Sequence, residues 1–198
     1  MKLPTCLLPF ALLATATAAQ PTPAPAAIPS KEVQIKAALQ AAAPQFRDGA
    51  MVYGYDERGQ FVVLRPGTNK LICLADDPAM KGFSAACYHQ DLEPFMARGR
   101  ELAAQGKKAV EITKIREEDV KSGKLKMPDR GVLNVTTGKH DAATGEVTEL
   151  YTRYVVYIPY ATPDTTGIPL APATPGGPWI MDAGTHRAHI MINPPKPK

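Results

Sequence analysis

The chain has 198 residues, with 23 Lys+Arg against 19 Asp+Glu, and 44% of its residues are hydrophobic. This length fits a single domain with a buried core, and the composition is too apolar for a disordered protein and too poor in repeats for a fibre. Beyond the N-terminus, no stretch is long and apolar enough to predict a membrane-spanning helix.

The first 19 residues are typical of a secretory signal peptide. Lys2 supplies a positive charge, Leu3 to Leu13 form a short apolar run, and small residues follow in an A-x-A-like cleavage pattern. An uncleaved membrane anchor is the alternative, but two prolines within the segment disfavour a stable helix. We therefore expect residues 1–19 to be removed and the mature protein to be secreted or periplasmic.

The rest of the chain divides into a linker, one domain and a tail. Residues 20–29 contain four prolines and no charged residue, a composition typical of an extended linker. Folded structure is expected to begin at Ser30, which is a good helix N-cap. We predict a single globular domain over residues 30–193 and a short tail over residues 194–198.

The sequence pattern predicts an α+β fold. A helix is expected over residues 31–43, before Pro44, and two more over residues 91–105 and 108–122. Apolar runs rich in β-formers predict a meander over residues 50–90, with strands near 51–55, 61–64, 71–74 and 83–88. Further strands are expected near residues 131–136 and 150–158, with short apolar runs at 179–181 and 188–192. The expected architecture is a mostly antiparallel sheet with two or three helices packed on one face.

Two cysteines, Cys73 and Cys87, remain after removal of the predicted signal peptide. Two thiols in an oxidising compartment are expected to pair, and closing a loop of about 15 residues contributes roughly 3 kcal/mol. Redox-active dithiols usually have C-x-x-C spacing, which this pair lacks. We therefore predict a structural disulfide, with two buried free thiols as the alternative.

A weak metal-ligand pattern lies near the C-terminus. His186 and His189 form an H-x-x-H sequence close to Asp182, and His89 is a candidate fourth ligand. Zinc requires three or four converging ligands, so this set predicts a zinc site and a small metal-dependent hydrolase as the alternative function. Residues three apart on a strand point to opposite faces, which favours two unrelated surface or hydrogen-bonded histidines instead.

A second possible catalytic pattern is weaker than the metal-ligand pattern. Residues 82–86 approximate the G-x-S-x-G nucleophile elbow, and Ser84, Asp182 and His186 follow the Ser…Asp…His order of α/β-hydrolases. That elbow requires a parallel sheet with alternating strands and helices, a pattern missing from this sequence. We interpret Ser84 as an ordinary strand residue.

Aromatic and basic residues are the remaining candidates for binding. Tyr157, Tyr160 and Trp179 flank a Pro-rich loop and predict a small-ligand or protein site, with sheet packing as the alternative. Residues 98–130 hold ten Lys/Arg and six Asp/Glu but no aromatic residue after Ala97, which favours a solvated helical face over nucleic-acid binding. The leading hypothesis is therefore an exported, non-catalytic binding or envelope-associated protein without a cofactor.

Overall fold

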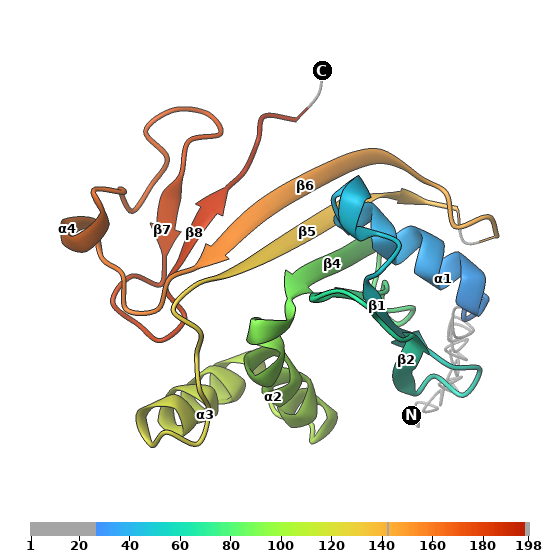
Figure 1. Cartoon of the computed structure of the whole chain (residues 1–198), viewed down its shortest axis with the longest axis horizontal. Helices are drawn as coiled ribbons and strands as arrows, with labels where there is room; N and C mark the ends of the chain where they lie inside the picture. Colours follow the sequence, from blue (N-terminus) through green and yellow to red (C-terminus); the bar gives the residue numbers. More distant parts are fainter. Residues whose placement is uncertain (1–26, 142, 197–198) are drawn as a thin grey trace, which may run out of the picture.

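A computed structural model describes residues 27–141 and 143–196. The predicted signal peptide, most of the predicted linker and the last two residues of the tail lie outside the described residues. The predicted α+β class is confirmed, because one eight-stranded, mostly antiparallel sheet is accompanied by helices (Figure 1). None of the helices within the described ranges is long and apolar enough to cross a membrane.

The sheet contains every predicted strand. The strands are β1 (Met51–Tyr55), β2 (Phe61–Arg65), β3 (Leu71–Leu74), β4 (Phe83–His89), β5 (Gly131–His140), β6 (Val147–Tyr157), β7 (Trp179–Met181) and β8 (His189–Ile192). Their order in the sheet is β2-β1-β3-β4-β5-β6-β8-β7. The long β5–β6 pair forms the middle of the sheet and extends across the molecule in Figure 1.

The first three strands differ from the predicted meander, because β1 lies between β2 and β3 and runs parallel to β3. The connection between β2 and β3 crosses the start of β1. There, the backbone N–H groups of Thr68 and Asn69 both donate to the carbonyl oxygen of Gly49. Gly67 passes so close that a Cβ on it would lie 2.6 Å from the backbone nitrogen of Met51. A glycine at this position is therefore required for the short crossover.

The helices are α1 (Lys31–Ala38), α2 (Glu93–Ala104), α3 (Ala109–Lys121) and the short α4 (Pro163–Thr166), with 3₁₀ turns η1 (Leu39–Ala41), η2 (Pro44–Phe46) and η3 (Gln90–Leu92). The helix predicted over residues 31–43 thus ends early and continues as a 3₁₀ turn. Its capping was predicted correctly, since the Ser30 hydroxyl accepts a hydrogen bond from the Val33 N–H.

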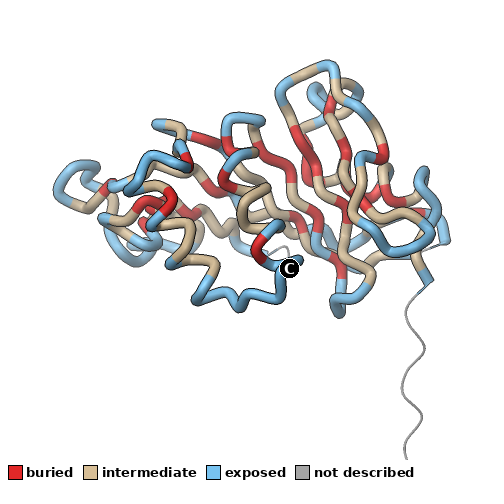
Figure 2. The backbone as a smooth tube through the Cα atoms, turned by 90° about the horizontal axis from the view of Figure 1, so that it is seen from below, coloured by how far each residue is buried: buried red, intermediate tan, exposed pale blue. Residues whose placement is uncertain are grey.

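The helices lie on both faces of the sheet, whereas the sequence analysis placed them on one. α1 and η1 bury Ala37, Ala38 and Ala41 against a face that includes Val52 of β1. The opposite face, which carries Ile72 and Tyr88, is covered by Leu92 of η3 and Met96 of α2. Strand residues alternate between the two faces, so each face presents its own apolar set to its own helices. Figure 2 shows the buried residues along the strands and the exposed ones mainly in the loops.

Candidate functional site

The predicted disulfide is present in the structure. Cys73 and Cys87 are direct neighbours on β3 and β4, their Cα atoms are 4.0 Å apart, and both residues are buried. They lie on the face covered by α1 and η1, where the Cys87 sulfur is 3.6 Å from the carbonyl oxygen of Ala38. The disulfide therefore stabilises the part of the sheet beneath these two elements.

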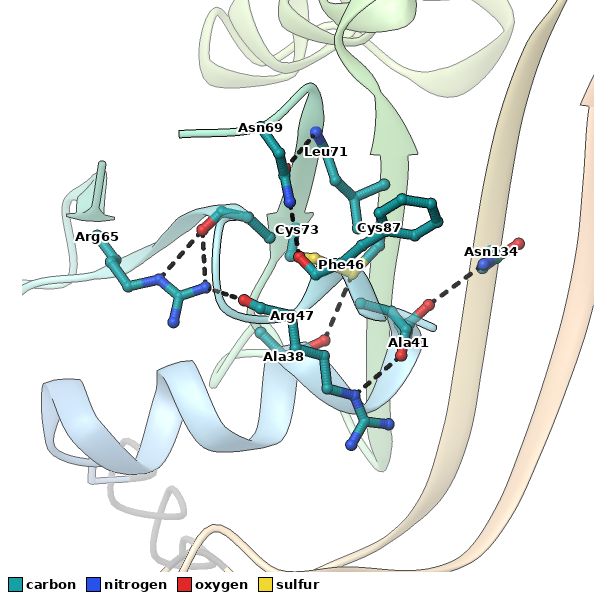
Figure 3. The surroundings of a disulfide bond; sticks show 12 residues. Ala38, Ala41, Phe46, Arg47, Arg65, Asn69, Leu71, Cys73, Cys87 and Asn134 are labelled. Carbon is teal, nitrogen blue, oxygen red and sulfur yellow. Dashed lines mark hydrogen bonds between the residues drawn. A yellow bond between two sulfur atoms is a disulfide. The ribbon is translucent and has the colours of Figure 1, made fainter. Parts of the chain in front are cut away.

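Side chains from the sheet and from the connection between β2 and β3 hold the segment that contains η1 and η2 in place (Figure 3). The Nδ2 atom of Asn69 donates to the carbonyl oxygen of Phe46, and the Arg65 guanidinium donates to the carbonyl oxygens of Arg47 and Ala50. Asn134 of β5 donates more weakly to the carbonyl oxygen of Ala41, at 3.4 Å. Hydrogen bonds from side chains thus satisfy an irregular backbone that lacks a regular ladder.

The end of this segment forms one wall of a groove of about 700 Å³ on the α1 side of the sheet. Its apolar lining consists of Phe46 on η2, Leu71 on β3, Val132 on β5 and Val156 on β6. Phe46 and Val132 are each 49% exposed, so two large apolar side chains border open space there. A groove of this size and composition falls in the range of small-molecule sites.

Polar residues lie at the edge of the groove where β4 ends and β3 and β5 begin: Lys70, His89, Asp91 and Arg130. The Nδ1 atom of His89 accepts from the Asp91 N–H and lies 3.3 Å from an Asp91 carboxylate oxygen. Lys70 and Arg130 are exposed, and neither forms an ion pair with any other described residue. The edge of the groove therefore carries two cations that have no ion pair among the described residues, together with the carboxylate of Asp91.

The predicted zinc ligands do not form one cluster. His89 lies on the α1 face of the sheet, whereas His189 is paired with Tyr157 on the face covered by α2. The Nδ1 atom of His189 is hydrogen-bonded to the carbonyl oxygen of Arg187, and the Asp182 carboxylate forms an ion pair with the Arg187 guanidinium at 2.7 Å. Across residues 27–141 and 143–196, no group of three or more His, Cys, Asp or Glu side chains is arranged to hold a metal.

His186 is instead a buried packing residue. Its ring is 2% exposed and packs edge-on against Phe95, and neither ring nitrogen has a hydrogen-bond partner among the described residues. Burial lowers the pKa of His186 below its usual value, with further lowering by nearby Arg116 and Arg187 and an opposing effect of Glu117. The imidazole is therefore held in its neutral form between α2 and the C-terminal strands.

The predicted aromatic site is also dispersed. Tyr157 packs against Phe95 and His189, and burial raises the pKa of its hydroxyl. Tyr160 is 52% exposed and lines a different cavity, formed by the end of α3, the connection from α3 to β5 and the residues after β6, while Trp179 lies in β7. Sheet packing, the alternative interpretation, describes Tyr157. Ser84 lies in β4, as its interpretation as a strand residue predicted.

Of the residues at the groove, the sequence analysis selected only His89, and for a different role. Phe46 and Lys70 were not singled out, Val132 and Val156 were included only within expected strands, and Arg130 was counted in the stretch interpreted as a solvated helical face. One sequence signal was available, since Lys70 and Arg130 each directly precede a predicted strand. Comparison of the chain with protein-family models, with curated proteins and with solved structures found no match in any of the three, so the geometry of this groove carries the functional argument.

Proposed function

We propose that this protein is an exported binding protein whose groove holds a small amphipathic molecule with an apolar body and one anionic group. The observation that carries this proposal is the position of two unpaired cations, Lys70 and Arg130, beside an apolar floor. Removing apolar ligand surface from water supplies the driving force, at about 25 cal/mol per Å². The two cations select the charge and orientation of the ligand.

The hydrogen bonds around the groove support binding rather than catalysis. Asn69 uses its oxygen for the Leu71 N–H and its nitrogen for the Phe46 carbonyl. The Asn134 nitrogen bonds to η1, and the His89 Nδ1 atom accepts from the Asp91 backbone. These side chains are engaged in shaping the groove. A rigid, preformed wall favours affinity because little conformational entropy is lost when a ligand binds.

Binding is tested with the fluorescent probe anilinonaphthalene sulfonate, which has an aromatic body and a single negative charge. We expect saturable binding to the folded protein that weakens as salt is added. Replacing both cations, in the variant Lys70→Gln/Arg130→Gln, is expected to weaken binding by about fivefold or more. Lys81→Gln, at another exposed lysine, is the matched control and should leave binding unchanged.

The floor is tested separately with Val132→Asp. Val63 provides a matched control, because it is 48% exposed against 49% for Val132 and lies on β2, away from the groove. We expect Val132→Asp to abolish probe binding and Val63→Asp to preserve it, with both variants unfolding cooperatively. Absence of saturable binding, or equal binding by the two variants, would contradict the proposed function.

We also propose that residues 1–19 direct export and are then removed. The Cys73–Cys87 disulfide supports this, because such bonds persist mainly in oxidising compartments. Intact-mass analysis of the protein from its native host is expected to show a chain that begins near residue 20, in the extracytoplasmic fraction. A soluble cytosolic protein that retains Met1 would contradict export.

A further inference from the structure

The floor of the groove belongs to one continuous row of side chains across the sheet. Strand register places Leu71 beside His89, Val132 beside Val156, and Val156 beside Ile190. Tyr88 pairs with Leu133, so the next position of the same antiparallel register brings His89 beside Val132. Side chains directly opposite each other on neighbouring strands share a face. The row therefore crosses β3, β4, β5, β6 and β8 on the α1 side.

The row is polar at one end and apolar along the rest. Lys70 and Arg130 border it near His89, and with the Asp91 carboxylate at the same edge they leave an excess of positive charge there. From there the row continues through Val132 and Val156, which line the groove, to Ile190, which lies beyond the lining residues; none of the three is fully buried. An apolar strip that leads away from a cationic edge matches a molecule with an anionic head and an apolar tail.

The row is closed at its far end. The next residue along it is Ile180 of β7, which pairs with Ile190 and is 2% exposed. Ile180 belongs to a buried cluster with Ala161 and Ala188, against which Ile168 also packs. The segment after β6 thus covers the row at β7. This sets a maximum length for anything that lies along the strip.

The maximum length of a ligand on the strip follows from the geometry of the sheet. Three strand spacings separate β4 from β8, which corresponds to about 14 Å. An extended alkyl chain advances about 1.25 Å per carbon, given single C–C bonds of about 1.5 Å. The open strip therefore accommodates a chain of roughly eleven or twelve carbons.

We infer that the ligand is a single-chain carboxylate, with its head between Lys70 and Arg130 and its alkyl chain along Val132, Val156 and Ile190. This inference rests on the proposed function and specifies the ligand class of the same groove. A single row of apolar side chains matches one alkyl chain. The carboxylate is bound without any covalent step.

The test is a calorimetric titration of the full mature chain with hexanoate, octanoate, decanoate, dodecanoate and tetradecanoate, each below its micelle-forming concentration. Affinity is expected to rise by about fourfold per added methylene up to dodecanoate. It should then level off, because the additional carbons reach the closed end at Ile180. Dodecyltrimethylammonium, with the same chain and the opposite charge, is expected to bind at least tenfold more weakly than dodecanoate.

Two variants test where the alkyl chain of the ligand lies. Ile190→Thr adds a polar group at the far end and is expected to weaken dodecanoate binding by about tenfold while hexanoate binding is unchanged, which also shows that the variant is folded. Val63→Asp is the control and should leave both affinities unchanged. Equal effects of Ile190→Thr on the short and the long carboxylate would overturn the placement of the chain.

The outcomes separate the two proposals. Probe binding that depends on Lys70, Arg130 and Val132, together with carboxylate affinities that do not vary with chain length, would overturn this inference and leave the proposed function standing. Tighter binding of the cationic amphiphile than of dodecanoate would also overturn it. If neither the probe nor any carboxylate binds, both proposals fail.

Discussion

Asn69 links the wall of the groove to its floor, because its Nδ2 atom donates to the carbonyl oxygen of Phe46 at 2.8 Å while its Oδ1 atom accepts from the Leu71 N–H at 2.9 Å. Phe46 belongs to the wall and Leu71 to the floor, so one side chain sets the spacing between them. The position of the Phe46 ring therefore depends on a residue in the connection between β2 and β3.

Replacing this amide is the first prediction. Asn69→Ala removes two hydrogen bonds and is expected to lower the free energy of unfolding by about 1–3 kcal/mol. It should also weaken binding of anilinonaphthalene sulfonate, because η2 is no longer held over β3. Denaturant titration and probe fluorescence measure the two effects. Gln40→Ala, which removes an exposed bond within the α1–η1 segment, is the control and should alter neither. An unchanged probe affinity in Asn69→Ala would contradict the role of this bond in shaping the groove.

The second prediction concerns the disulfide. Replacing both cysteines in Cys73→Ala/Cys87→Ala, or reducing the wild type, is expected to lower the free energy of unfolding by about 2–5 kcal/mol. The physical reason is that the unfolded chain gains freedom when the link is lost. Denaturant unfolding with and without reductant measures this decrease in the free energy of unfolding. The double variant should not respond to reductant, and a count of two free thiols in the native protein would contradict the prediction.

The third prediction is a pH dependence from His186. Its pKa is lowered in the folded state by burial, from an ordinary value of 6.5. As the pH falls below about 6.5, the unfolded chain binds a proton that the folded protein excludes. Stability is therefore expected to fall with decreasing pH from that point down to the lowered pKa of the folded state. Arg116, Arg187 and Lys121 oppose protonation there, whereas Glu117 favours it.

Denaturant midpoints between pH 7.5 and pH 5 measure this dependence. His186→Phe removes the titrating group and is expected to flatten the profile, while Gln40→Ala, at a residue that does not titrate, is expected to retain the wild-type slope. A wild-type slope in His186→Phe would show that another group is responsible.

The fourth prediction concerns the contact between α2 and α3. The Arg116 guanidinium lies 3.9 Å from the centre of the Phe95 ring and donates to the Phe95 carbonyl oxygen. A Cβ on Gly99 would lie 3.0 Å from the same guanidinium, so α2 leaves little room there. Arg116→Ala is expected to destabilise the protein by about 1–3 kcal/mol.

Arg116→Lys should restore little of this stability, because an ammonium group lacks the planar surface that stacks on the ring. Lys114→Ala, at an exposed position of the same helix, serves as the control. Amide hydrogen exchange in α3 locates the effect. Equal protection of α3 in Arg116→Ala and in the wild type would contradict the proposed role of this contact.

The sequence was sufficient for much of the fold, because strands and helices leave local signals. The disulfide was predictable from the number of cysteines and from the predicted oxidising compartment, and the disulfide itself is confirmed. The distribution of helices between the two faces was not predictable. α1 uses an alanine stripe that includes Ala37 and Ala38, and α2 uses Phe95 and Met96, but neither stripe indicates which side of a sheet it meets.

The groove could not be predicted from local sequence patterns, for a related reason. It combines Phe46, Leu71, Val132 and Val156, which lie on four elements far apart in the sequence. Their proximity depends on strand order, and in particular on β3, β4 and β5 being neighbours. The H-x-x-H pattern, which is local, drew attention to His186 and His189, whose roles in the structure are packing and hydrogen bonding.

The helical pair α2–α3 leaves the sheet after β4 and returns to it at β5, and the two points of attachment touch. A Cβ on Gly131 would lie 2.6 Å from the Leu92 side chain, so the departing and returning chains are locked together at the base. The far tip, around Gly106, is exposed. Because loop closure becomes only slowly more costly with length, a foreign peptide or a whole reporter domain can be spliced in at Gly106 while the strands stay in register. The loop between α2 and α3 is therefore a suitable attachment point for labels and sensors that report on the groove from a distance.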